Sequence, residues 1–477
     1  MQEMKEEQEK REGHTYWQWI LALLVNMTLF TYGLDVGWTS PMVKVLQSEQ
    51  SPAGEPLSDI TVSWIASIVC LAAVFAVFIY SYIAERFGSK VSVIAIATPQ
   101  AISWLIRLCF VSGPWLITSR FISGIAAGGC FNAVVMYVKE ISQDSVRGVL
   151  GSMLVLVQNI GVLLMYIMGA YLDYNMVTWI VACIPVINGI LLFQAPQSPA
   201  FLVKQGKIDE AIATVAFLRG LNRDHKTVMS EVEFMKNEDD YYKSQPNLSL
   251  ITIVKNLIWR RGLIVSTVII MVQGMNGAFA VTTYASSILT STGVKFNVSA
   301  ETLTLSIPII LIFGSIVFTI CADRIGRRTH SIIMLSIAAC SNLGIGVSML
   351  MKLYGGTVPN WLPILCMMTS VWSYSGGVAA LPYIIMAEMF SFQTRAKVLG
   401  MTITLAWLAS FIQLIGYIPL SNAAGLHTTF FIFAGVNTFG IIFTLLFLPE
   451  TRGKSVEQIE EDLAIRIGLD KVDKNMT

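Results

Sequence analysis

The six residues Glu85-Arg86-Phe87-Gly88-Ser89-Lys90 return, with related chemistry, as Asp323-Arg324-Ile325-Gly326-Arg327-Arg328. Two further patterns follow each copy in the same order. A Glu and an Arg seven residues apart occur as Glu140 with Arg147 and as Glu388 with Arg395, and Pro196-Gln197-Ser198 is matched by Pro449-Glu450-Thr451. Counted from their first residues (85 and 323, 140 and 388, 196 and 449), the copies lie 238, 248 and 253 residues apart in a chain of 477. This order and spacing indicate a tandem duplication of one structural unit.

The composition indicates where the two units reside. Hydrophobic residues make up 54% of the chain, charged residues only 13%, and the mean hydropathy is +0.64. A soluble chain of this length is less apolar, and here the charges cluster between long apolar runs. We therefore expect an all-α integral membrane protein with twelve transmembrane helices in two six-helix bundles. Duplicated halves in a membrane are typical of transporters.

Twelve apolar runs are long enough to cross a bilayer as helices, which takes about 20 residues each. In the first half we expect spans at Trp17–Val36, Thr61–Tyr82, Val91–Val111, Trp115–Val138, Val149–Leu172 and Val177–Ala195. In the second half we expect them at Leu263–Leu289, Leu303–Ala322, Ile332–Leu353, Leu362–Phe390, Val398–Leu420 and Phe430–Leu448. The predicted domains are an N-terminal bundle (1–195), a cytoplasmic linker with short amphipathic helices (196–261), a C-terminal bundle (262–450) and a cytoplasmic tail (451–477).

Basic residues predict the orientation, because Lys and Arg stay on the cytoplasmic side in short loops. The termini, the linker and alternate loops hold 27 of the 32 Lys and Arg residues, whereas the opposite side shows only Lys44, Lys295 and Lys352. Both termini are expected in the cytoplasm of a multi-pass plasma membrane protein. Asn297, in Asn297-Val298-Ser299, falls on the outside and is a candidate for N-glycosylation.

Other classes of function find little support. All seven Cys lie in apolar spans or at their ends without CxxC spacing, which favours free packing thiols over a disulfide or metal site. Neither a nucleophile motif nor a Gly-rich phosphate loop occurs. The four His are scattered over termini and loops, at His14, His225, His330 and His427. We expect no enzyme, no cofactor, no metal and no nucleic acid partner.

Motifs over nearly the whole chain resemble those of the sugar porter family of the major facilitator superfamily. They are Arg120 to Gly124 with Gly128, Tyr137 with Glu140, Arg147-Gly148 with Leu150-Gly151, Pro196 with Ser198-Pro199, the box from Asp323 to Arg328, Glu388 with Arg395, and Pro449-Glu450-Thr451 with Gly453 and Ser455. The stretches 37–41 (GWTSP) and 158–161 (QNIG) are similar to the insect branch called facilitated trehalose transporters. The resemblance implies a carrier for a small neutral solute, a hexose or trehalose, that works by alternating access.

The resemblance also gives the charged boxes a role as a cytoplasmic gate, in which ion pairs between helix ends hold one face closed in one state. The members would be Glu85, Arg86, Glu140 and Arg147 in the first half, and Asp323, Arg324, Arg327, Glu388, Arg395 and Glu450 in the second. Alternatively, these residues only follow the positive-inside rule. Where the family has charged residues this chain has Ser89, Gln197 and Ala200, so the latch is expected to be weaker in the first half.

Members of the family hold sugars with amide and aromatic side chains, since an amide both donates to and accepts from hydroxyls. Much of that set is replaced here, by Val155, Ile270, Met271, Leu311 and Ala406. The candidates for sugar binding are amides about one helical turn away from lost positions, together with retained residues: Gln158, Asn159, Gln273, Asn276, Tyr383 and Trp407. The amides could instead form hydrogen bonds between helices. Because the inherited set is eroded, the alternative function is a non-transporting sugar sensor that retains the fold.

Asp35 is a carboxylate within a predicted span, where an isolated charge is costly and needs a partner or a proton. Arg120, in the fourth span, is the expected partner. The position resembles one where proton-coupled sugar porters carry Asp, so Asp35 and Arg120 are candidates for proton coupling, with a purely structural ion pair as the alternative. Arg107, in the third span, receives no role. The expected partners are thus a sugar, the lipid bilayer and, if transport is coupled, protons.

Overall fold

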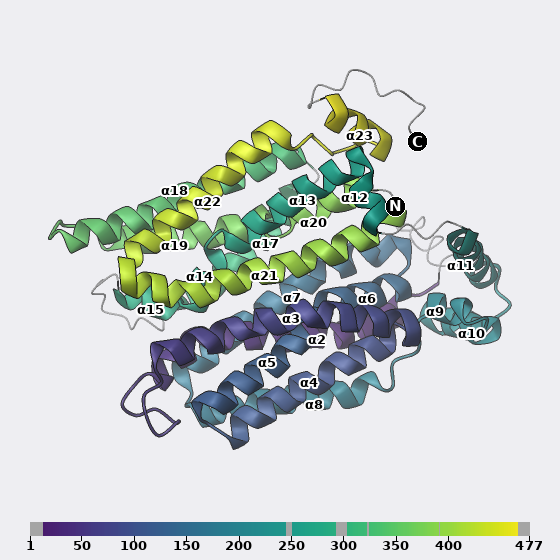
Figure 1. Ribbon diagram of the computed structural model, residues 1–477. Coiled ribbons are helices and arrows are strands. Elements are labelled where there is room, and N and C mark those ends of the chain that lie inside the picture. Colours follow the sequence, from purple (N-terminus) through teal and green to yellow (C-terminus); the bar gives the residue numbers. More distant parts are fainter. Residues whose placement is uncertain (1–12, 245–249, 292–302, 322–323, 391, 466–477) are drawn as a thin grey trace, which may run out of the picture.

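The chain folds into two bundles of helices that lie side by side (Figure 1). The computed structural model describes residues 13–244, 250–291, 303–321, 324–390 and 392–465. Asp323 of the predicted gate and Asn297 of the predicted glycosylation site lie outside these ranges.

The first bundle follows the six predicted spans of the first half. Its helices are α2 (Tyr16–Leu46), α3 (Asp59–Phe87), α4 (Ser89–Cys109), α5 (Gly113–Gly129), α6 (Val135–Ile141), α7 (Asp144–Tyr171) and α8 (Tyr174–Leu192). A π-helical turn, η1 (Cys130–Val134), joins α5 to α6, so these two helices form one segment.

The second bundle is less regular, because two of its segments are interrupted. Its elements are α13 (Leu257–Met275), α14 (Ala278–Thr283), α15 (Ala285–Ser291), α17 (Ser306–Cys321), α18 (Arg327–Leu353), α19 (Trp361–Ser373), η2 (Tyr374–Val378), α20 (Leu381–Met389), α21 (Phe392–Ala424) and α22 (Leu426–Phe447). Across the described ranges, eleven segments are long and apolar enough to cross a membrane, and α17 is a shorter apolar helix of 16 residues. These twelve correspond to the twelve predicted spans.

The first predicted span ends too early. Its expected end is Val36, but α2 continues for ten more residues to Leu46, with Pro41 inside it. Trp38, Met42 and Leu46 recur every four residues, are at most 1% exposed and belong to one apolar cluster with Trp104. Burial of this stripe outweighs the helix-breaking tendency of proline.

The seventh predicted span, Leu263–Leu289, is wrong as a continuous helix. It breaks at Asn276-Gly277, where Gly277 has a φ of +98°, a left-handed conformation that favours glycine. Asn276 Oδ1 accepts a hydrogen bond from the Ala278 N–H (3.0 Å). The Asn276 carbonyl oxygen accepts from the side-chain amides of Asn342 (3.0 Å) and Asn437 (2.9 Å). These partners satisfy backbone groups that the break would otherwise leave unpaired inside a membrane.

The tenth segment bends where the sequence indicates. The π-helical turn η2 separates α19 from α20, and Leu381-Pro382 begin α20, as the combination of Gly376, Gly377 and Pro382 suggests. His330 was expected in a terminus or loop but is 1% exposed inside α18. Its Nε2 lies 2.9 Å from the Gly376 carbonyl oxygen, so it interacts with the irregular turn.

The two bundles meet along four pairs of elements. α3 packs along α21, α7 against α17, and α2 against α14 and α15. We call the boundary between residues of the two halves the seam. The predicted amphipathic segment forms α9 (Pro199–Lys204), α10 (Ile208–Arg219) and α11 (Lys226–Ser244), which share a small apolar core. We call the end of the molecule that carries α9–α11 the linker end, and the opposite end the far end.

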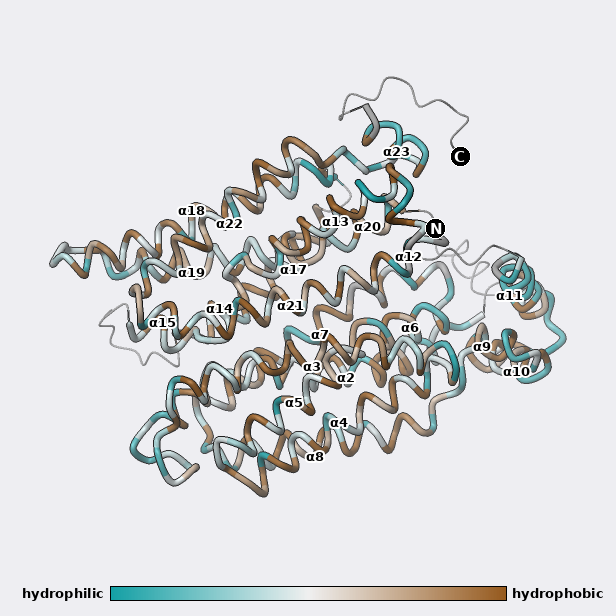
Figure 2. The backbone as a smooth tube through the Cα atoms, viewed as in Figure 1, coloured by the Kyte–Doolittle hydropathy of each residue, from teal (hydrophilic) through white to brown (hydrophobic). Residues whose placement is uncertain are grey.

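The bundle helices and the helices at the linker end differ in hydropathy. Figure 2 shows hydrophobic residues along the lengths of the bundle helices, whereas α11 at the linker end is mostly hydrophilic. The short helices α12 (Leu250–Lys255) and α23 (Val456–Ile465) also lie at the linker end (Figure 1). The elements that leave the bundles therefore gather at one end.

Helices α2 and α7 touch backbone to backbone, which yields a first prediction. A Cβ atom on Gly161 of α7 would lie 2.3 Å from the Phe30 carbonyl oxygen of α2, whereas one on Gly151 of the same helix would meet nothing within 4 Å. Gly161→Ala should therefore push the helices apart and lower the stability by about 1–3 kcal/mol. Thermal unfolding of the detergent-solubilised protein measures the effect.

Gly151→Ala is the matched control, because it makes the same chemical change in open space. It should leave the unfolding temperature unchanged or slightly higher, since alanine favours helix more than glycine does. Equal stability of the two variants would contradict the close packing of α2 and α7.

Candidate functional site

The seam is bridged by hydrogen bonds near the far end. The Tyr166 hydroxyl of α7 donates to the Thr282 carbonyl oxygen of α14 (2.6 Å). At the ends of α3 and α21, Asn422 Nδ2 donates to Asp59 Oδ2 (2.9 Å). Tyr166 also belongs to a buried apolar cluster from both halves, which includes Val162 of α7 and Ala285 of α15. The structure therefore has the two halves joined at the far end.

The predicted sugar-binding residues differ in their relation to this seam. Asn159 of α7 lies on it, because its Nδ2 donates to Ser315 Oγ of α17 (3.0 Å). Trp407 of α21 packs partly buried against apolar clusters of both halves. Gln158 is partly exposed, and its carbonyl oxygen faces Gly33 of α2. Asn159 and Trp407 are thus brought to the boundary between the halves.

Other predicted sugar-binding residues lie inside the second half. Asn276 is 1% exposed and belongs to the break between α13 and α14 described above. Gln273 Nε2 donates to the Ala379 carbonyl oxygen (3.0 Å). Tyr383 is partly buried and packs against Ile270 and Met386. Gln273 therefore bonds between helices, the alternative that the sequence leaves open, whereas the Asn276 amide bonds within its own break.

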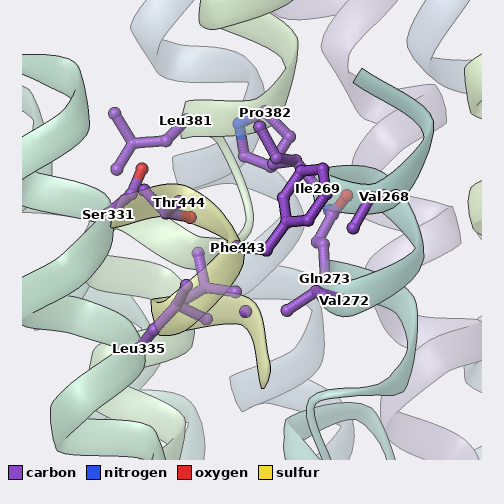
Figure 3. A pocket seen from close by; sticks show the side chains of 12 residues that line it. Val268, Ile269, Val272, Gln273, Ser331, Leu335, Leu381, Pro382, Phe443 and Thr444 are labelled. Atoms are coloured by element: carbon purple, nitrogen blue, oxygen red, sulfur yellow. The ribbon is translucent and has the colours of Figure 1, made fainter. Parts of the chain in front are cut away.

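A small cavity of about 20 Å³ lies beside Gln273, with room for about one water molecule. Figure 3 shows Gln273 of α13 near its edge, with Ser331 of α18, Pro382 of α20 and Phe443 of α22 around it. All of its lining residues belong to the second half. The cavity is therefore too small for a sugar and is lined by one bundle alone.

Gln413 of α21 is a polar residue that the sequence analysis missed. It is 5% exposed, and its amide, oriented to satisfy its neighbours, accepts from the Gly277 N–H (2.7 Å) and donates to the Gly274 carbonyl oxygen (3.3 Å). A lone Gln within an apolar run indicates that its amide pairs with polar groups of a neighbouring helix, because unpaired amides are costly in a membrane.

The predicted partners Asp35 and Arg120 are brought together. Arg120 Nη1 lies 2.7 Å from Asp35 Oδ2, and their side chains are 4% and 5% exposed. Arg107, which the sequence analysis left without a role, is the second partner: its Nη2 lies 2.5 Å from Asp35 Oδ1 and its side chain is fully buried. Ser123 Oγ also donates to Asp35 Oδ2 (3.0 Å). Asp35 therefore lies between two guanidinium groups.

The predicted gate residues of the first half lie at the linker end, where the described partners are hydroxyl and backbone groups. Ser89 Oγ donates to Glu140 Oε2, so the serine that replaces a family arginine still holds the carboxylate. Arg147 Nη2 donates to the Ser142 carbonyl oxygen (3.0 Å). Arg86 Nη1 donates to the Tyr82 hydroxyl (3.2 Å), whereas Glu85 is exposed.

In the second half, the gate residues form a connected set. Arg327 Nη2 lies 2.9 Å from Glu388 Oε1, and Thr451 Oγ1 donates to Glu388 Oε2 (2.5 Å). Glu450 accepts from the backbone N–H of Arg327 (2.7 Å), at the start of α18. A carboxylate at the N-terminus of a helix accepts hydrogen bonds from its free N–H groups and interacts favourably with the helix dipole.

Two more gate residues interact through backbone groups. Arg395 Nη2 donates to the Phe390 carbonyl oxygen (3.1 Å), and the Arg324 carbonyl oxygen accepts from Arg452 Nη1 (2.7 Å). Nearby, Trp259 Nε1 donates to Glu460 of α23 (3.0 Å), and burial raises the pKa of this carboxyl although the hydrogen bond opposes the change. Each of these contacts joins residues of the second half or its tail.

The sequence from residue 21 to 463 matches the model of the family described as sugar (and other) transporter. The chain belongs to this family. It is therefore a membrane transporter and not an enzyme, as the sequence motifs predict.

Similar proteins include facilitated trehalose transporters Tret1 of mosquitoes. The protein of Culex quinquefasciatus is 26% identical over 457 residues, which cover 95% of this chain and 87% of that protein. The Aedes aegypti protein is 26% identical over 456 residues, and this chain spans 56% of its length. These similarities agree with the predicted insect branch.

The fold is similar to that of the xylose transporter XylE from E. coli in an inward open conformation. The TM-score is 0.76 with 18% sequence identity, over 93% of this chain and 99% of XylE. A structure of the same protein, described as a proton:xylose symporter bound to 6-bromo-6-deoxy-D-glucose, gives a TM-score of 0.72 with 19% identity, over 94% and 100% of the two chains. The predicted major facilitator fold is confirmed.

The bridge from Tyr166 to Thr282 yields a second prediction. Tyr166→Phe removes a hydrogen bond across the seam, and the net value of such a bond is about 0.5–1.5 kcal/mol. The population with an open far end should rise roughly two- to tenfold. The rate at which a membrane-impermeant thiol reagent labels a cysteine placed at Ser286, a buried residue of the far end, reports this population.

Tyr80→Phe serves as the control. The Tyr80 hydroxyl donates to the Ala95 carbonyl oxygen (3.1 Å), so the same atom is lost from a bond inside the first half. Labelling should then stay at the wild-type rate. An equal rise in both variants would show that the effect is general loosening and not opening of the seam.

Proposed function

We propose that this transporter carries a small neutral sugar, a hexose or trehalose, across the plasma membrane by alternating access. The main support is the arrangement of the seam: two duplicated bundles are joined by hydrogen bonds near the far end, and each bundle keeps its own charged contacts at the linker end. Such bundles can rock about a site between them. The similarity to trehalose transporters favours trehalose, and the fold is shared with a xylose transporter.

In this proposal Asn159 and Trp407 contact the sugar at the seam, since they lie where the halves meet. An amide suits hydroxyl groups, and an indole face covers the apolar side of a sugar ring. Gln158, which precedes Asn159, and Tyr383, which packs near Ala406 on α21, complete the proposed site. Gln273 and Asn276 act mainly as supports of the interrupted seventh segment.

The gate residues stabilise each half at the linker end in the same proposal. Arg327 and Glu388 link α18 to α20, and Glu450 ties the start of α18 to the tail. Glu140 holds α6 against α4 through Ser89. When the linker end closes, these groups meet across the seam. The alternative function of a non-transporting sensor is not favoured, because the family match covers nearly the whole chain.

Uptake of radiolabelled sugars by transporter-deficient cells tests the third prediction. At least one of glucose, fructose, xylose or trehalose should enter faster than in control cells. Trp407→Ala should lower uptake at limiting sugar about tenfold or more at equal surface level, because it removes a large contact face. Trp179→Ala is the matched control, since Trp179 is 61% exposed on the outside of α8. Wild-type uptake in the Trp407 variant would exclude a contact between this residue and the sugar.

We also propose that the linker end is cytoplasmic, on the basis of the Lys and Arg distribution. In the fourth prediction, an epitope inserted at Gly206, in the turn after α9, should bind antibody only after cells are permeabilised. An epitope inserted at Gly54, in the turn between α2 and α3 at the far end, should bind antibody on intact cells. The reverse pattern would invert the orientation.

A further inference from the structure

The buried carboxylate of Asp35 has one more positive partner than it can neutralise. Arg107 and Arg120 each lie within 2.7 Å of one of its oxygens, so three fully or nearly buried charged groups carry a net charge of +1. Protonation of Asp35 would leave two adjacent guanidinium groups without any negative charge. Since Arg does not lose its proton in proteins, this state is strongly disfavoured in a membrane.

Arg107 is held firmly in its place. Its Cζ lies 4.3 Å from the Trp104 ring centroid and 4.7 Å from that of Trp38, within cation–π range. Its Nε donates to Ser119 Oγ (3.2 Å) and its Nη2 to Ser103 Oγ (3.1 Å). With these partners on three helices, Arg107 cannot withdraw from Asp35 by a side-chain rotation alone.

All of the described partners of the cluster belong to the first half. Arg120 donates to the Ile65 carbonyl oxygen (3.0 Å) and to Thr39 Oγ1 (3.1 Å), so α2, α3, α4 and α5 enclose Asp35. Rocking of the two bundles as bodies changes contacts across the seam but leaves contacts within a bundle intact. The transport cycle therefore supplies no step that separates Asp35 from its two arginines.

The other titratable groups that face the cluster offer no substitute proton site. Among the described residues they are phenols and thiols of α2, α3, η1, α8 and the turn between α14 and α15: Tyr32, Cys70, Cys130, Tyr174 and Tyr284. Phenols and thiols are neutral near pH 7 and do not accept protons there.

We infer that Arg107 is a positioning residue that keeps Asp35 ionised throughout the cycle, so that the sugar moves down its gradient without a coupled proton. The inference rests on the transport function proposed above. It assigns Arg107 a role in deciding the mode of transport, and it makes Asp35 with Arg120 a structural pair in the native chain.

The test uses the full chain, purified and reconstituted in liposomes that contain a pH-sensitive dye. Uptake of the labelled sugar identified in the cell assay should be equal with and without an inward proton gradient, and the sugar should evoke no proton entry. A coupled carrier could accumulate sugar up to about tenfold per pH unit of gradient. Accumulation in the wild-type protein, or proton entry evoked by the sugar, would overturn the inference.

In Arg107→Gln, protonation of Asp35 leaves one guanidinium group without a negative charge instead of two, so this state is less disfavoured and uptake should become dependent on pH. Arg107→Lys keeps the charge, and Ser103→Ala keeps both arginines while it removes one hydrogen bond to Arg107, so both should remain independent of pH. If Arg107→Gln folds and its uptake stays independent of pH, the role given to Arg107 is wrong.

Infrared spectroscopy of the protonated carboxyl group separates failure of this inference from failure of the proposed function, because it requires no transport. Between roughly pH 5 and 8, Asp35 should show no protonation in the wild-type protein but should titrate in Arg107→Gln. The double variant Asp35→Asn with Arg107→Gln keeps the net charge of +1 and should lack this signal. If no sugar is taken up, the transport proposal fails, while titration of Asp35 in the wild-type protein would still overturn the inference.

Discussion

A charge buried in a membrane must find its partners within the protein, because neither lipid nor neighbouring apolar side chains can solvate it. This constraint organises the first bundle around Asp35. Its carboxylate receives Arg107 from α4 and Arg120 from α5, and Arg120 in turn binds backbone oxygen of α3. The four helices that enclose the cluster are therefore tied together by charge-assisted bonds, and loss of one partner would leave an uncompensated charge in the core.

The same constraint applies to the backbone in the second bundle, where two segments are interrupted. The break at Asn276 is tolerated because Asn342, Asn437 and Gln413 converge on the freed groups. At the bend of the tenth segment, His330 meets the Gly376 carbonyl oxygen. Each interruption is thus surrounded by polar side chains from neighbouring helices. The buried ion cluster of Asp35 lies in the first bundle, but both bundles bury amides, such as Asn188 in the first and Asn437 in the second.

The sequence was sufficient for the fold class, because apolar length and repeated motifs depend on composition and order alone. It was less informative where packing decides. α2 continues past Val36 because Trp38 and Met42 pack into an apolar cluster with residues of other helices. The residues around Pro41 give no local indication of this packing. Arg107 was not connected with Asp35 because it belongs to none of the quoted family motifs and meets Asp35 only when α2 and α4 pack, whereas Arg120 belongs to such a motif. Gln273 and Asn276 were recognised as buried polar residues, but their neighbours determine whether they face a sugar or another helix.

The distribution of strong and weak contacts suits alternating access. Apart from the bond of Asn422 to the Asp59 carboxylate, the polar and aromatic contacts described across the seam are neutral. They include hydrogen bonds of Tyr166 and Asn159, and an aromatic contact between Trp64 and Phe411 with centroids 6.3 Å apart. Each is worth about 0.5–1.5 kcal/mol, and the exposed bond of Asp59 contributes less because solvent competes for it. Their sum is a few kcal/mol, and the apolar surface that both halves bury in the cluster at the far end adds to it. Breaking the ion cluster of Asp35 would cost about 3–5 kcal/mol for one partner alone. Movement between the bundles therefore breaks the weak contacts at the seam and spares the strong ones inside the first bundle.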